Sequence, residues 1–183
     1  PTLDRKVPFT VRASGTAADA TAESCFATLE AAILYLNFFG NGVQQKTTLM
    51  NRGPHTVPAT VTLPQNDIVF EGDENAEFIT GAALTPMFDL NANSRVTFRN
   101  ILFTCNHATS VAIGGATGGT SERRVERCRF VSGSQNWARA INLAGASPTT
   151  GVMIRECRIA AADVGIRITR PVQAKVYDCV VTE

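Results

Sequence analysis

The sequence predicts an all-β fold, a single-stranded parallel β-helix of about four to five coils, from a repeat and from the period inside it. Four segments carry the same apolar pattern, and they are Val96–Phe103, Val125–Phe130, Val152–Ile159 and Val176–Val181. An imperfect repeat of about 20–50 residues indicates stacked supersecondary units. Inside each segment the apolar period is close to that of a strand. Strands that return to one position in every repeat build a solenoid with a continuous interior.

The repeats align at one position, occupied by Ile101, Cys128, Cys157 and Cys179 at intervals of 27, 29 and 22 residues. In each repeat, further apolar residues lie three positions earlier and two positions later. An interval of three breaks strict alternation, so we expect two strands that meet at a bend of two outward residues. The expected inward columns are Phe98, Val125, Ile154 and Val176 before the bend, and Phe103, Phe130, Ile159 and Val181 after it.

A second inward set follows each repeat, in the pairs Phe88/Leu90, Val111/Ile113, Ile141/Leu143 and Ile166/Ile168. Each coil therefore has at least two stacked strand positions. The connections 114–120 and 144–151 have turn composition and differ in length. A solenoid tolerates such variation, because insertions map to loops.

The outward bend positions support the same register. Neighbouring coils stack about 4.8 Å apart, so equivalent side chains are cross-strand neighbours. The bend columns are Arg99, Glu126, Arg155, Tyr177 and Asn100, Arg127, Glu156, Asp178. Opposite charges then meet at Arg99–Glu126, Glu126–Arg155 and Arg127–Glu156. As exposed pairs, each is worth under about 1 kcal/mol, so they indicate alignment more than stability.

The N-terminal third differs in kind. Residues 1–20 read as an extended arm with a short strand near 7–12, and Asp19 or Thr21 is suited to cap a helix. An apolar stripe at Ala22, Phe26, Leu29, Ile33 and Leu36 predicts an amphipathic helix, which ends before the glycines of the turn. We expect residues 21–42 to cover the open end of the first coil; the alternative is a helix that binds a partner. Residues 43–183 form the β-helix, which we expect to continue beyond this chain.

Five cysteines are present, with no spacing suited to zinc. Cys128, Cys157 and Cys179 share one inward column, where a thiol acts as a small buried hydrophobe. A redox centre or a ladder of metal ligands is the alternative. Cys25 and Cys105 also read as structural. Buried reduced thiols favour assembly in a reducing cytosol.

Composition limits the partners. The formal net charge is +1, and no basic block is present, so we expect no nucleic-acid partner. No apolar run approaches the roughly 20 residues that a membrane span needs. No cofactor or metal site is predicted.

Three stretches resemble the pectin-lyase-like superfamily of right-handed parallel β-helices. They are Gly15–Ala22, Leu29–Ile33 and Thr60–Gly72, which match an Asp/Thr-rich helix start, an amphipathic helix and a TLPxNxxxxG strand. The resemblance covers about residues 15–183, and it implies a right-handed β-helix with an N-terminal capping α-helix. Ala17–Ala20 lacks the glycine that often follows the acidic residue at this entry. The superfamily contains polysaccharide lyases, hydrolases and many phage tailspike and tail-fibre proteins.

Candidate site residues are few. Glu156 and Asp178 share a column on adjacent coils, near the separation of about 5–5.5 Å that a retaining glycosidase needs; otherwise both point into water. Trp137 lies in a polar loop beside Arg139, where an indole can stack on a sugar or pack on the solenoid. His55 and His107 read as surface-loop residues, and Asp89 has no assigned role.

The sequence leaves two functions open. The first is a structural and adhesive virion protein of tailspike or tail-fibre type, assembled in the host cytoplasm and in contact with other virion proteins and a host polysaccharide. The second is a polysaccharide lyase or glycoside hydrolase of the same superfamily; we favour the non-enzymatic reading. An outer column with Leu102, Arg129, Arg158 and Val180 suits a subunit interface, so we expect a homotrimer along the solenoid axis.

Overall fold

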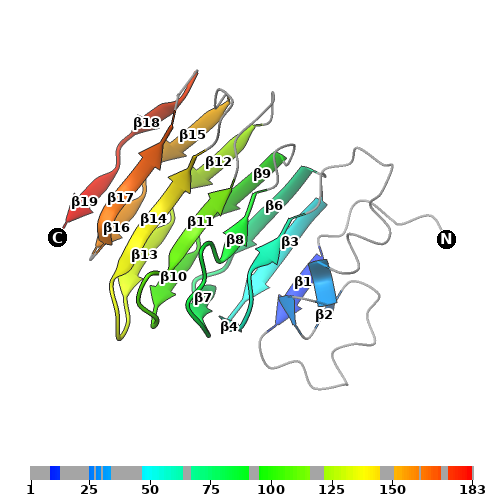
Figure 1. Ribbon diagram of the computed structural model, residues 1–183. Coiled ribbons are helices and arrows are strands. Elements are labelled where there is room, and N and C mark those ends of the chain that lie inside the picture. The colour runs from blue at the N-terminus through cyan, green and yellow to red at the C-terminus, as the bar shows by residue number, and fades with distance from the viewer. Residues whose placement is uncertain are drawn as a thin grey trace.

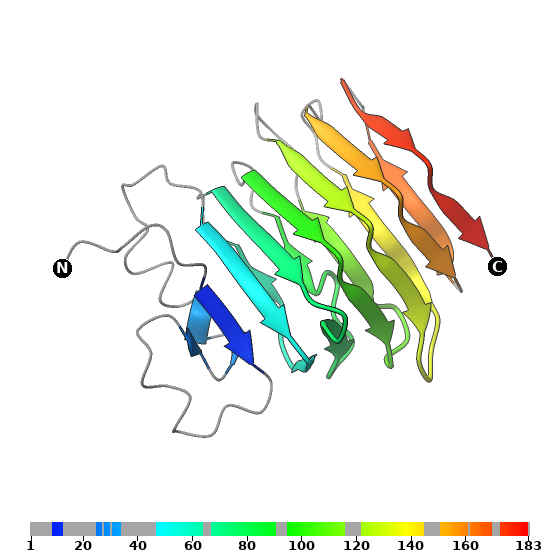
Figure 2. The ribbon, with the colours of Figure 1, turned by 180° about the vertical axis from the view of Figure 1, so that it is seen from behind.

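The computed structural model describes residues 9–12, 25–26, 28–29, 31–33, 47–63, 67–90, 95–115, 122–144, 151–160, 162–169 and 173–182. In these residues the chain forms a parallel β-solenoid, in which successive coils lie beside one another along a single axis (Figures 1 and 2). The strands gather into three sheets, here called A, B and C. The predicted parallel β-solenoid is therefore confirmed.

Sheet A contains β1 (Phe9–Arg12), β2 (Cys25–Phe26), β3 (Thr47–Arg52), β6 (Asp67–Gly72), β9 (Arg95–Arg99), β12 (Arg123–Glu126), β15 (Val152–Arg155) and β18 (Lys175–Tyr177). Sheet B contains β4 (Pro54–Val57), β7 (Glu77–Thr80), β10 (Leu102–Cys105), β13 (Arg129–Ser132), β16 (Arg158–Ala160) and β19 (Val180–Thr182). Sheet C contains β5 (Val61–Thr62), β8 (Phe88–Asp89), β11 (Val111–Gly115), β14 (Trp137–Leu143) and β17 (Ala162–Ile168).

The chain visits the sheets in the fixed order A, B, C. The triplets are β3-β4-β5, β6-β7-β8, β9-β10-β11, β12-β13-β14 and β15-β16-β17, and β18 and β19 follow in sheets A and B. The number of complete triplets falls within the predicted four to five coils. Each strand pairs with the equivalent strand of the neighbouring coil, and the two strands run in the same direction. The inter-coil pairings are therefore parallel.

The two inward columns on either side of the bend are confirmed. In sheet A, Val125 pairs with Phe98 on one side and with Ile154 on the other. In sheet B, Phe130 pairs with Phe103, and the column continues through the next two coils. In the last coil, Val176 and Val181 keep this register but are 47% and 55% exposed. The rings of Phe103 and Phe130 stack with centroids 4.8 Å apart, which is the spacing expected between adjacent coils.

The corner between sheets A and B has a backbone feature that the sequence did not reveal. Its second residue adopts a left-handed conformation in four coils, at Asn100, Arg127, Glu156 and Asp178, with φ between 52° and 57°. This conformation turns the chain sharply without extra residues. It is unfavourable for Arg and Glu, which carry a Cβ and lack the local hydrogen bonding of Asn and Asp.

The cysteine column completes this corner. The thiols of Cys128, Cys157 and Cys179 each donate to the carbonyl oxygen two residues earlier, at 3.4, 3.2 and 3.3 Å. Cys128 and Cys157 are buried and all three cysteines are free. Burial raises the pKa of Cys157 to about 12 and raises that of Cys128 further. The predicted structural role of the column agrees with this geometry.

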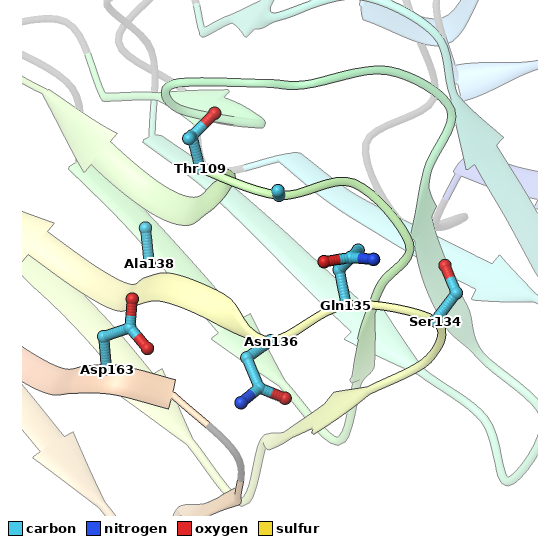
Figure 3. Close-up of a pocket in the computed structure, with 7 residues that line it drawn as sticks. Thr109, Ser134, Gln135, Asn136, Ala138 and Asp163 are labelled. Carbon is cyan, nitrogen blue, oxygen red and sulfur yellow. The ribbon is translucent and has the colours of Figure 1, made fainter.

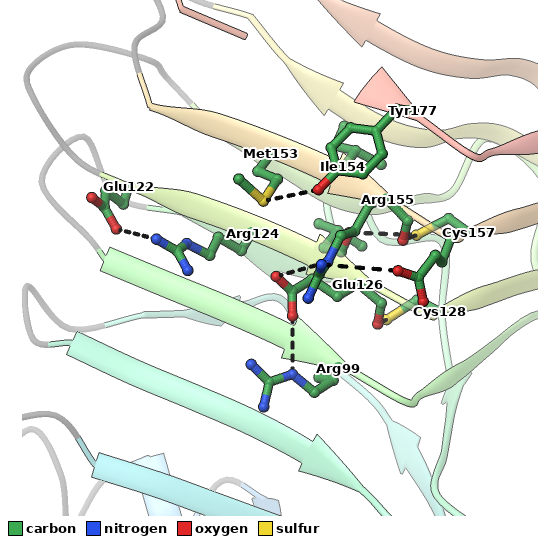
Figure 4. A network of polar contacts seen from close by, with 12 residues as sticks. Arg99, Glu122, Arg124, Glu126, Cys128, Met153, Ile154, Arg155, Cys157 and Tyr177 are labelled. Atoms are coloured by element: carbon green, nitrogen blue, oxygen red, sulfur yellow. Dashed lines mark hydrogen bonds and ion pairs between the residues drawn. The ribbon is translucent and has the colours of Figure 1, made fainter. Parts of the chain in front are cut away.

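The outward bend position also differs from expectation at Glu126. Its side chain is 2% exposed, and it forms ion pairs with Arg99 at 3.0 Å and with Arg155 at 3.3 Å (Figure 4). Both predicted pairs therefore exist, but Glu126 is buried between them. The third predicted pair is wrong: across the described coils Arg127 makes no ion pair with Glu156, which lies 3.9 Å from Arg155.

The second set of inward residues, in sheet C, faces the interior as predicted. Its predicted register is wrong for one coil, that of β11. Ile113, not Val111, pairs with Phe88 and with Ile141. Val111 instead pairs with Arg139. A shift of two residues keeps every side chain on the same face, so the hydrophobic pattern alone cannot detect it.

The capping helix predicted within residues 21–42 is not confirmed. Cys25–Phe26 form strand β2, and helical conformation in the described residues is confined to Leu29 and 31–33. Leu29, Ala32 and Ile33 are nevertheless buried in the core, as the apolar stripe predicts. The other residues of this segment lie outside the described ranges.

The cap of this helical turn is Thr28. Its Oγ1 accepts a hydrogen bond from the Ala31 N–H at 3.1 Å, which is the geometry of an N-cap. Asp19 and Thr21, the predicted caps, lie outside the described residues. The predicted arm contributes strand β1, which pairs with β3 in sheet A, so the short strand near 7–12 is confirmed at Phe9–Arg12.

Candidate functional site

A polar pocket of about 490 Å³ lies at the turn between sheets B and C. The described residues that line it are Ala108, Thr109, Ser134, Gln135, Asn136, Ala138 and Asp163 (Figure 3). Two consecutive loops and the outer surface of sheet C provide them. In Figure 3, Thr109 lies across the pocket from Asn136 and Asp163.

The pocket exists because turn length changes from coil to coil. Residues 106–110 connect β10 to β11, and 133–136 connect β13 to β14. A single residue separates β16 from β17 in the next coil. The two longer loops therefore have no counterpart of equal length between β16 and β17. Asp163, near the start of β17, lines the pocket next to these two loops.

Hydrogen bonds hold the two loops together. Asn106 Oδ1 accepts from the Ser134 N–H at 3.0 Å, and Ser134 Oγ donates to the Asn106 carbonyl oxygen at 2.9 Å. The carbonyl oxygen of Cys105 accepts from the N–H groups of Gly133 at 2.7 Å and Gln135 at 3.2 Å. A Cβ at Gly133 would lie 2.1 Å from Asn106 Oδ1, so this close approach requires glycine. These hydrogen bonds join the two loops into one rim.

Trp137 anchors the second loop from below. Its side chain is fully buried, and its Nε1 donates to the Val131 carbonyl oxygen at 3.0 Å. Of the two readings of Trp137, the structure agrees with packing on the solenoid, and the exposed position that sugar stacking needs is not found. Its place in β14 in phase with Ile141, an inward residue, was the signal that would have shown this.

Cys105 supports the rim from the inside. It is buried, and its thiol lies within hydrogen-bonding distance of the carbonyl oxygens of His107 at 3.2 Å and Asn136 at 3.4 Å, either of which can accept its one proton. Burial raises the pKa of this thiol, and its hydrogen bonds only partly oppose that effect. A neutral, inert thiol at this position agrees with the predicted structural role.

Thr109 carries backbone strain at the pocket. Its φ is 67°, a left-handed conformation that is a genuine outlier for a β-branched residue. Such a residue costs about 1–3 kcal/mol and persists only where the surroundings hold it in place. Strain of this kind concentrates at ligand-binding positions.

The chemistry of the lining is that of neutral hydrogen bonding. Thr109 and Ser134 provide hydroxyl groups, Gln135 and Asn136 provide carboxamides, and Asp163 is the one charged residue among the described lining residues. Hydroxyls and carboxamides both donate and accept hydrogen bonds. This set can bind a polyhydroxylated ligand.

The other candidates lie outside the pocket. Arg139 is half-buried in β14, between Val111 and Val164, and does not line the pocket. Glu156 and Asp178 occupy equivalent, exposed corners of adjacent coils, as predicted.

The two histidines and Asp89 have different surroundings. His55 lies in β4 and is 6% exposed, with its ring 5.7 Å from that of Phe78, so the surface-loop prediction is wrong for it. Proline precedes it, yet the strand continues, because β4 is the edge strand of sheet B. His107 lies in the 106–110 loop and is half-buried, and Asp89 is half-buried in β8.

A buried arginine was not anticipated. Arg123 pairs with Val96 and Val152 in sheet A and is 2% exposed. Burial lowers the pKa of its guanidinium. Its position two residues before Val125, an inward residue, was the signal in the sequence.

The described ranges contain neither a cluster of metal-ligating side chains nor a helix that could cross a membrane. No three His, Cys, Asp or Glu side chains in those ranges are grouped to hold a metal ion. No helix there has the length and apolar character that a membrane crossing needs.

Comparisons of the chain with protein-family models, with curated protein sequences and with solved structures found no match. The superfamily resemblance drawn from the sequence therefore remains a prediction.

Proposed function

We propose that this chain is a structural and adhesive virion protein of tailspike or tail-fibre type, a right-handed β-helix that contacts a glycan on the host surface. The observation that carries the proposal is the rigid polar pocket at Thr109, Asn136 and Asp163. A parallel solenoid provides the rigid scaffold that such a contact needs, because loops placed on stacked coils keep fixed spacings. The sequence resemblance supports the virion class.

Assembly as a homotrimer along the solenoid axis belongs to this proposal. The outer column of sheet B runs through Leu102, Arg129, Arg158 and Val180. Val180 is 54% exposed and Leu102 is half-buried. Long cationic side chains beside apolar ones suit a surface that another subunit covers. Light scattering on the protein in solution tests this arrangement, and a stable monomer contradicts it.

Binding to cells tests the adhesive function. The labelled protein is incubated with host bacteria, either untreated or after periodate oxidation of their surface sugars. We expect retention on untreated cells and loss of retention after oxidation. Equal retention on both would contradict a glycan contact.

A polysaccharide lyase or glycoside hydrolase is the second candidate. It is favoured by Glu156 and Asp178, which lie at equivalent corners of coils that stack about 4.8 Å apart. Retaining glycosidases hold two carboxyl groups about 5–5.5 Å apart. Release of oligosaccharides from host polysaccharide, lost in Glu156→Gln and in Asp178→Asn, would establish this activity in place of simple adhesion.

A further inference from the structure

We infer that the pocket selects uncharged or amino-bearing sugars over acidic ones, and that Asp163 sets this selectivity. The inference rests on the proposed glycan contact and adds the class of ligand. The Thr109 hydroxyl and the carboxamides of Gln135 and Asn136 can donate and accept hydrogen bonds, and the Ser134 hydroxyl, whose proton is donated to the Asn106 carbonyl oxygen, can accept them. These groups match the hydroxyl and acetamido groups of sugars. None of these four side chains carries a charge.

The charge of Asp163 determines whether a charged sugar is attracted to the pocket or repelled from it. Asp163 is exposed, and it is the one charged side chain among the described residues that line the pocket. The nearest cation along β14 is Arg139, but it alternates with Ala138 and therefore belongs to the opposite face of the sheet. A sugar carboxylate would meet a like charge, and a sugar ammonium would meet an opposite one. Two unit charges about 4 Å apart in water change an affinity by about 5-fold.

The rim favours binding because it is already ordered. Ser134 and Gly133 are bonded to the preceding loop, and Trp137 closes the second loop through its bond to the Val131 carbonyl oxygen. A pre-ordered site loses little conformational freedom when a ligand binds. Thr109, whose backbone is strained, lies on the opposite side of the pocket from Asp163.

An array that carries amino, neutral N-acetylated and acidic oligosaccharides tests the inference. The probes are compared on the unaltered protein, on Asp163→Asn and on the control Glu74→Gln, which removes an exposed carboxylate in the turn after β6, outside the pocket. Trp137 provides a second readout, because it is the single tryptophan of the chain and adjoins Asn136 and Ala138. Melting temperatures establish that both variants fold.

We expect the unaltered protein to bind amino and neutral oligosaccharides more tightly than acidic ones, by up to about 5-fold. Asp163→Asn should remove the preference for amino over neutral sugars and strengthen binding of acidic ones, while Glu74→Gln changes neither. Tight binding of acidic sugars, or a profile that Asp163→Asn leaves unchanged, overturns the selectivity and leaves the glycan contact standing. Binding to no sugar on the array contradicts the proposed glycan contact itself.

Discussion

Glu126 Oε2 lies 3.0 Å from Arg99 Nε on the adjacent coil, although both side chains come from the outer surface of sheet A. Arg155 approaches the same carboxylate from the other side at 3.3 Å, and the two arginines leave the Glu126 side chain 2% exposed. Burial alone would raise the pKa of Glu126, but the hydrogen bonds and charges of the two arginines outweigh it and lower the pKa. Three coils are thus joined through one carboxylate.

Removing this charge should destabilise the solenoid. We expect Glu126→Gln to lower the free energy of unfolding at pH 7 by about 1–2 kcal/mol, because both arginines lose their shared partner but remain about a third exposed, and Arg99 keeps its pair with Glu71. The control is Glu122→Gln, which breaks an exposed pair with Arg124 and should cost under about 1 kcal/mol. Urea unfolding measures both, and equal effects would show that Glu126 acts as an ordinary surface residue.

The same carboxylate predicts a pH dependence. Because its pKa is lower in the folded protein than its ordinary value of 4.5, the folded state binds the proton less tightly than the unfolded chain. The stabilisation is therefore complete above about pH 4.5 and is lost as the pH falls through the lowered value. We expect the stability difference between the unaltered protein and Glu126→Gln to shrink between pH 5 and about pH 2. A difference that stays constant over this range contradicts the assignment.

The left-handed corner predicts a stabilising substitution. Arg127 has a φ of 52° and is exposed, so Arg127→Gly should relieve strain and raise the free energy of unfolding by about 1 kcal/mol. Arg127→Val should lower it, because a β-branched residue fits this conformation poorly. Arg129→Gly, two residues away in β13, serves as the control and should also lower it, since glycine weakens a strand. Thermal denaturation measures the stability of the three variants. A destabilised Arg127→Gly would contradict the left-handed geometry of the corner.

Thiol reactivity should follow position in the cysteine column. Cys179 is half-buried in the last described coil, whereas Cys128 and Cys157 are buried and their pKa values are raised by burial. Thiolates are the reactive species. In the native protein at pH 8 we expect maleimide to modify Cys179 well before the other two. Peptide mapping over time measures the rates, and equal labelling of Cys128 and Cys179 would show that the column is not buried as described.

The rim should depend on Gly133. A Cβ there would lie 2.1 Å from Asn106 Oδ1 and 2.9 Å from the Cys105 carbonyl oxygen. We expect Gly133→Ala to cost about 1–3 kcal/mol and to shift the emission of Trp137, because the loop must move away. Asn106→Ala alone also destabilises, because Asn106 Oδ1 accepts the Ser134 N–H, so the two changes are compared in a double-mutant cycle. Gly133→Ala should cost less in the Asn106→Ala background, where the nearest clash is gone, and an equal cost in both backgrounds would place the strain elsewhere.

The sequence predicted the parts of the fold that depend on alternation of apolar residues. Phe98, Val125 and Ile154 form the expected column because each must face a dry interior. The register of Val111 could not be predicted, because a slip of two residues leaves the buried face unchanged. The left-handed corner was hidden because Arg127 and Glu156 are residue types that rarely adopt it.

The candidate site was beyond prediction for a different reason. The pocket arises from the difference between a loop over 133–136 and a connection of one residue in the next coil, and such a difference is visible only once the strands are placed. The residues around Asp163 in the sequence are small or apolar, and they carry no motif that marks it as a binding residue. Trp137 was misplaced because the polar run before it reads as an exposed loop, while its side chain points into the core.

The position of a bound sugar tests the account most directly. A crystal structure of the protein with the oligosaccharide that binds most tightly on the array shows where the ligand lies. We predict one sugar residue in the pocket, within hydrogen-bonding distance of Asn136 and Asp163, with an intact glycosidic bond. A sugar bound at the Glu156–Asp178 corner, or elsewhere on the solenoid, would contradict the account.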